Sequence, residues 1–107
     1  MPASVSSNRS GGVLTVAVSG EIDIATSAAV ETAVVRAVAT DGVRAVEVDL
    51  SGVEFLDSSG VASLLKGRRS ADEHGVEFRV TGARGVAKRI LELTGVWAHL
   101  SGEPDPT

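Results

Sequence analysis

Segments with the hydrophobic period of a β-strand alternate along this chain with segments that have the period of an α-helix. This order is compatible with few folds. Some segments alternate apolar and polar residues, which is the two-residue period of a half-buried β-strand. Others repeat apolar residues three or four positions apart, as on one face of an α-helix. The strand-like segments are 13–19, 46–50 and 76–80, and the helix-like segments are 27–39, 59–73 and 86–93. Strands that alternate with single helices pair in parallel through right-handed crossovers, so we expect an α/β fold.

Turn residues place the ends of these elements. We expect the first strand to end at Gly20, a loop to run over 51–57, and the three helices to end at Asp41-Gly42, Gly75 and Gly95. The helices should face inward with Val30, Val34 and Val38, then Val61, Leu64 and Leu65, and finally Val86, Ile90 and Leu93. Gly67 is unfavourable inside a helix, and we interpret it as a point of close packing.

Weaker signals lie at the two ends of the chain. A strand around 5–8, followed by Ser10, Gly11 and Gly12, would form an N-terminal β-hairpin and supply an antiparallel edge. A short last strand is predicted over 96–100. The expected organisation is one small domain over 1–100, with a mixed, mostly parallel sheet and helices packed on it, and a flexible tail over 101–107.

Composition excludes several functional classes. Only 3% of the residues are aromatic, so a base-stacking surface is not expected, and the net charge of −4 with scattered basic residues disfavours nucleic-acid binding. The chain has no cysteine, no signal peptide and no apolar run long enough to span a membrane, so a cytoplasmic location without membrane contact is the default expectation.

Two loops carry the candidate site residues, because functional groups in α/β sheets gather beyond the carboxyl ends of the strands. One loop is Gly20-Glu21-Ile22-Asp23 and the other is Phe55-Leu56-Asp57-Ser58-Ser59-Gly60. Neighbouring parallel strands would bring Asp23 and Ser58 to the same edge of the sheet. Spacing alone also allows a purely structural role, in which Asp57, Ser58 or Ser59 is a helix N-cap and Asp23 a solvated turn residue.

The motifs in these loops resemble those of the STAS family of bacterial anti-sigma factor antagonists. The resemblance rests on Gly20-Glu21-Ile22-Asp23 with Thr26, Val48-Asp49-Leu50, the 55–60 loop and Val86-Ala87-Lys88-Arg89-Ile90-Leu91, in that order over about 13–100. It implies a regulator of transcription that works by partner switching. The unphosphorylated form would bind an anti-sigma factor that is itself a serine kinase, and a serine phosphatase would act on the phosphorylated form.

The same resemblance assigns residues. It implies that Ser58 is phosphorylated, which switches binding off, and that Asp23 lies beside it in the partner surface, with Asp57, Ser59 and Gly60 around the site. Ser59 would then cap the helix. A phosphate adds about 1.5 to 2 negative charges, which a helix N-terminus accommodates and an acidic interface does not. Many relatives end in a further helix, which this sequence is not expected to have.

Other functions find less support. A serine hydrolase needs a base, and only His74 and His99 are available, while Ser58 lacks the glycine of a nucleophile elbow two positions before it. No dinucleotide-binding glycine run follows a predicted strand, and no metal-ligand spacing occurs, so neither an enzyme nor a cofactor is expected. The main alternative is another STAS role, as an accessory subunit of a transporter or a scaffold in a stress-signalling complex, without a phosphoswitch.

Overall fold

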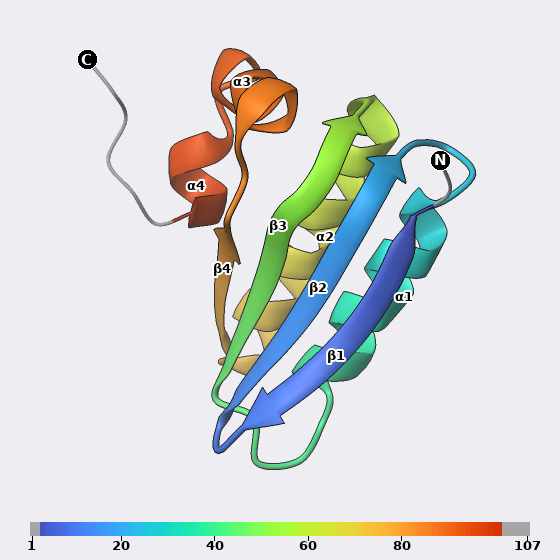
Figure 1. Cartoon of the computed structure of the whole chain (residues 1–107). Coiled ribbons are helices and arrows are strands. Elements are labelled where there is room, and N and C mark those ends of the chain that lie inside the picture. Colours follow the sequence, from blue (N-terminus) through green and yellow to red (C-terminus); the bar gives the residue numbers. More distant parts are fainter. Residues whose placement is uncertain (1–2, 102–107) are drawn as a thin grey trace.

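The alternating segments form the four strands of one sheet in a computed structural model that describes residues 3–101 (Figure 1). The strands are β1 (Ser4–Ser10), β2 (Val13–Ile22), β3 (Ala45–Leu56) and β4 (Glu77–Thr81), in the sheet order β1-β2-β3-β4. β1 pairs with β2 antiparallel, whereas β2, β3 and β4 are parallel. The predicted mixed sheet with an N-terminal hairpin is therefore confirmed.

Two long helices cover one face of this sheet. α1 (Ser27–Val38) and α2 (Ser58–His74) lie side by side behind the sheet in the view of Figure 1. Their contact depends on Gly67, since a Cβ atom there would lie 2.7 Å from Cγ1 of Val34. The interpretation of Gly67 as a close packing point is confirmed. Gly75 ends α2 in the left-handed conformation (φ 68°), as expected.

The core between sheet and helices is aliphatic. On both central strands the predicted alternation holds, and the inward residues are fully or almost fully buried. They are Leu14, Val16 and Val18 on β2, and Val46, Val48 and Leu50 on β3. Burying an aliphatic side chain of this size stabilises the fold by roughly 1.5–3 kcal/mol. The buried residues of β2 and β3 therefore determine which face of the sheet packs against the helices.

β3 is longer than predicted because it contains two irregularities in its pairing with β2. The register shifts between Ala17 and Ser19 and again between Gly20 and Glu21, and each shift adds one residue on β3. The buried positions therefore change from alternate residues to Leu50, Val53 and Leu56, three apart. The predictions of a loop over 51–57 and of a strand end at Gly20 are wrong for this reason.

The last part of the chain differs from its prediction. Residues 96–100 do not form a strand; α4 (Trp97–Ser101) is a short helix beside β4, in which Trp97 and Leu100 are buried at a spacing of three. Lys88 lies 5.4 Å from the centre of the Trp97 ring. α4 thus takes the place of the predicted last strand. Ser101 is a buried residue of α4, and the remaining residues of the predicted tail, 102–107, lie outside the described part.

The inward face of α3 (Gly85–Leu93) also differs from the prediction. Ala87 and Leu91 are buried and Ile90 is partly buried, whereas Val86 and Leu93 are exposed. Two neighbouring apolar stripes run along this helix, about 100° apart, and sequence periodicity does not indicate which one packs. The stripe containing the small Ala87 lies against the protein.

Candidate functional site at the carboxyl edge of the sheet

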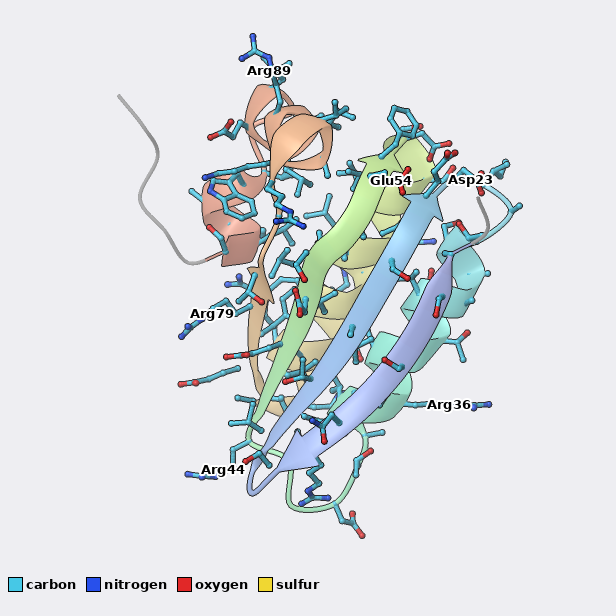
Figure 2. All side chains as sticks on the ribbon, viewed as in Figure 1. Asp23, Arg36, Arg44, Glu54, Arg79 and Arg89 are labelled. Carbon is cyan, nitrogen blue, oxygen red and sulfur yellow. The ribbon has the colours of Figure 1, made fainter. Side chains whose placement is uncertain are left out.

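The ends of β2 and β3 bring the two predicted loops together. Ile22 pairs with Leu56 in the parallel register, and the Asp57 amide donates to the Ile22 carbonyl at 3.1 Å. In Figure 2, Asp23 and Glu54 both lie at this end of the sheet. The expectation that Asp23 and Ser58 lie at one edge of the sheet is confirmed.

Asp57 holds the start of α2. Its backbone is extended (φ −101°, ψ −168°), and its carboxylate accepts hydrogen bonds from the amides of Ser59 at 2.8 Å and Gly60 at 3.2 Å. Asp57 is therefore the N-cap, and the prediction that Ser59 caps the helix is wrong. Ser59 is the second residue of α2, and its amide donates to the Asp57 carboxylate. It lies inside the helix, so it is not the N-cap residue.

Ser58 is presented to solvent by this cap. It is the first residue of α2 and is exposed, whereas Ser59 is half-buried. An incoming enzyme can reach a hydroxyl at Ser58 without opening the helix. Of the two serines proposed for the site, Ser58 is thus the more exposed.

Gly60 allows α2 to start this close to the sheet. A Cβ atom at this position would lie 2.8 Å from the Ile22 carbonyl oxygen and 2.9 Å from Cβ of Leu56. Both neighbours belong to the buried ends of strands, so neither can move aside without disturbing the core. Glycine at this position therefore fixes where Ser58 lies.

Asp23 organises its own loop. Its Oδ1 accepts hydrogen bonds from the amides of Ala25 at 2.9 Å and Thr26 at 3.2 Å. The Thr26 hydroxyl accepts from the Asp23 amide at 2.9 Å and donates to the Glu21 carbonyl at 2.9 Å. Reciprocal bonds of this kind make the loop a rigid turn. Asp23 thus contributes both a charge to the edge and the hydrogen bonds that hold its loop in place.

Sequence reasoning missed three further features of this edge. Glu54 adds a carboxylate near the end of β3, and Ile24 and Phe55 are exposed apolar residues, at 83% and 41% exposure. Phe55 points outward because the second register shift lies directly before it. The position of Ile24 in a loop, directly after the polar Asp23, is the one signal in the sequence that could have indicated its exposure.

The arrangement gives no support to a hydrolytic site at Ser58. His74 is sixteen positions further along α2, which corresponds to roughly 24 Å along a helix axis, and its Nδ1 lies 2.7 Å from the Ser70 carbonyl oxygen. His99 belongs to α4, where its carbonyl oxygen accepts a hydrogen bond from Arg68 in the second half of α2. Neither histidine is close enough to act as a base for Ser58.

Other features of the described chain lie away from this edge. Surface cavities of about 540 and 470 Å³ are both lined by residues of β4, and none of the site residues lines either of them. Within residues 3–101, no group of three or more acidic or histidine side chains could hold a metal ion. No helix in that range is long and apolar enough to cross a membrane.

Residues 4–104 of the chain match the family model of the STAS domain. The chain belongs to the STAS domain family. Among solved structures, this STAS domain is similar to an anti-sigma factor antagonist from Mycobacterium paratuberculosis, with 39% identity, a TM-score of 0.77, and 88% of this chain and 79% of that chain covered. The resemblance to anti-sigma factor antagonists expected from the motifs is thus confirmed at the level of the family.

Two more distant structures share the fold of this STAS domain. One is the anti-sigma factor antagonist SpoIIAA in its unphosphorylated form, at 15% identity and a TM-score of 0.75, with 88% of this chain and 83% of that chain covered. The other is the murine anion transporter Slc26a9, at 22% identity and a TM-score of 0.72, with 84% of this chain but only 15% of the transporter covered. A search of curated proteins finds no match.

Proposed function

We propose that this STAS domain is a bacterial anti-sigma factor antagonist controlled by phosphorylation of Ser58. In its unphosphorylated form it binds an anti-sigma factor that is also a serine kinase, and thereby frees the sigma factor. Phosphorylation stops that binding, and a serine phosphatase restores it. The domain and the anti-sigma factor would meet in the cytoplasm. The observation that carries the proposal is the exposed Ser58 hydroxyl at the capped start of α2.

The surroundings of Ser58 support a switch in which the phosphate blocks docking. The Asp57 carboxylate already accepts from the amides of Ser59 and Gly60, which a phosphate at the helix N-terminus would otherwise use. A phosphate on Ser58 would therefore add its charge close to Asp57 without receiving those two hydrogen bonds. Docking would have to strip water from this phosphate and fit the partner around its bulk, and each 1.4 kcal/mol of that cost weakens binding about tenfold.

The fold itself should tolerate the phosphate. Ser58 is exposed, so its phosphate would extend into water, and the buried residues behind it would stay packed. The switch would then act by blocking an interface and would leave the domain folded. Backbone amide NMR shifts confined to the surroundings of Ser58 on phosphorylation are the expected result, and shifts throughout the domain would contradict it.

A pull-down from lysate of the native organism tests this function. The baits are wild type, Ser58→Ala, Ser58→Asp and, as a matched control, Ser59→Ala, with captured proteins and bait phosphorylation identified by mass spectrometry. We expect a serine-kinase anti-sigma factor on every bait except Ser58→Asp, and phosphate on Ser58 of the wild type. Equal capture of transporter or stress-complex components by all baits, with no phosphate, would favour the accessory-subunit or scaffold role and contradict the proposal.

A further inference from the structure

Exposed apolar side chains gather beside the candidate phosphorylation site. Ile24 follows the end of β2 by two residues and is 83% exposed, and Phe55 lies next to the end of β3 and is 41% exposed. Their backbones are held together, because Glu21 pairs with Phe55 and Ile22 with Leu56 in the parallel register. Two large apolar side chains exposed together at one edge of the sheet indicate a contact surface.

Ile24 is held out from the surface by a rigid turn. The Oδ1 atom of Asp23 closes the turn across Ile24 by accepting from the Ala25 amide at 2.9 Å. The Thr26 hydroxyl bonds to the Asp23 amide and the Glu21 carbonyl, both at 2.9 Å. An apolar side chain on a turn that is already ordered loses little conformational entropy on binding, which is the property of an interface anchor.

The same turn is fixed relative to Ser58. The Asp57 amide donates to the Ile22 carbonyl at 3.1 Å, and Gly60 lies directly against the same carbonyl group. A partner that covers Ser58 must therefore also meet the turn that carries Ile24. The apolar contact and the phosphorylation site belong to one surface.

The charges around Ile24 define the chemistry of the partner. Asp23 directly precedes Ile24, Asp57 follows the end of β3, and Glu54 is an exposed residue near that end, so this edge of the sheet carries three carboxylates. An apolar centre with a charged rim is the usual composition of a protein interface, and complementarity requires a basic rim on the other side. The fitting surface is an apolar recess lined at its mouth by arginine or lysine side chains.

We propose that Ile24 is the apolar anchor by which this STAS domain binds its anti-sigma factor, entering an apolar recess with a basic rim, with Phe55 as the second apolar contact. This inference rests on the proposed function, because it names the contact residue of the same binding site. The Asp23–Thr26 hydrogen bonds then serve to position Ile24. Phosphorylation of Ser58 would place a bulky, strongly hydrated group between this surface and the recess, and so keep Ile24 from entering it.

Calorimetric titration of the purified anti-sigma factor kinase captured in the pull-down tests the anchor. The variants are Ile24→Ala, the conservative Ile24→Leu, and Val35→Ala as a control, since Val35 is a 39% exposed apolar residue on α1. We expect Ile24→Ala to raise Kd at least about tenfold, the loss typical of an interface hot spot. Ile24→Leu and Val35→Ala should stay close to wild type, and all variants should unfold at the wild-type temperature.

The salt dependence of Kd separates the apolar contribution of Ile24 from the electrostatic contribution of the surrounding carboxylates. Higher salt should raise Kd for wild type and Ile24→Ala alike, because it screens the carboxylates, while the ratio of the two Kd values stays constant. A Kd of Ile24→Ala within twofold of wild type, with binding still abolished by Ser58→Asp, would overturn the anchor and leave the proposed function intact. If the wild type binds no such kinase and Ser58→Asp changes nothing, the proposed function itself fails, and the anchor fails with it.

Discussion

Replacing Asp57 by alanine should destabilise the domain and disorder the site. The carboxylate makes two hydrogen bonds, at 2.8 and 3.2 Å, to the amides of Ser59 and Gly60, and Gly60 is buried against the strand ends. Loss of an N-cap costs about 0.5–2 kcal/mol, and two partly buried amides lose their acceptor, which places this site near the upper end. For a domain of this size, that corresponds to a fall in Tm of roughly 10 °C.

Two further substitutions isolate the cap. Asp57→Asn keeps an acceptor oxygen of the same reach and should stay within about 0.5 kcal/mol of wild type. Asp72→Ala removes an acid from the exposed end of α2, where it pairs with Arg68 at 3.3 Å, and should also cost less than about 1 kcal/mol. Urea unfolding followed by circular dichroism measures all three. Equal unfolding free energies for Asp57→Ala and Asp57→Asn would refute the capping role.

Three other substitutions test how the edge is built. Gly60→Ala places a Cβ atom 2.8 Å from the Ile22 carbonyl oxygen and should cost about 1–3 kcal/mol by urea unfolding, and wild-type stability would contradict the close approach. Thr26→Val removes the hydroxyl that bonds to the Asp23 amide and the Glu21 carbonyl, so hydrogen exchange of the Asp23 amide should accelerate. Unchanged protection would mean that the turn does not depend on this hydroxyl. Gly67→Ala should lower the unfolding free energy by about 1 kcal/mol alone but by less in a Val34→Ala background, because the new Cβ atom would lie 2.7 Å from Cγ1 of Val34. Additive losses of unfolding free energy for the two substitutions would exclude that contact.

The parts of the fold that sequence predicts well are those in which one period holds over the whole element. Val46, Val48 and Leu50 alternate strictly, and their strand and its inward face are as predicted. After Leu50 the register shifts change the spacing of the buried residues to three, and alternation no longer marks the strand. Pairing irregularities depend on the neighbouring strand, so a single strand's sequence does not reveal them.

The other differences between prediction and structure arise where the local sequence fits more than one structure. Asp57, Ser58 and Ser59 are all good N-cap residues, and only the position of the strand end selects Asp57. Trp97 and Leu100 are three apart, which fits a helix, but five residues are too few for periodicity to decide between helix and strand. The placement of Ser58 and Asp23 at one edge follows from parallel pairing alone, whereas the exposure of Ile24 and Phe55 requires the three-dimensional structure.

The affinity of the STAS domain for its anti-sigma factor, before and after phosphorylation, tests the central proposal most directly. Purified anti-sigma factor would be titrated with the unphosphorylated domain and with the domain fully phosphorylated on Ser58, as verified by mass spectrometry. The proposal predicts tight binding of the first form and binding at least about a hundredfold weaker for the second, equivalent to about 2.8 kcal/mol. Equal affinities for the two forms, or phosphate that the kinase places on Ser59 and not on Ser58, would contradict it.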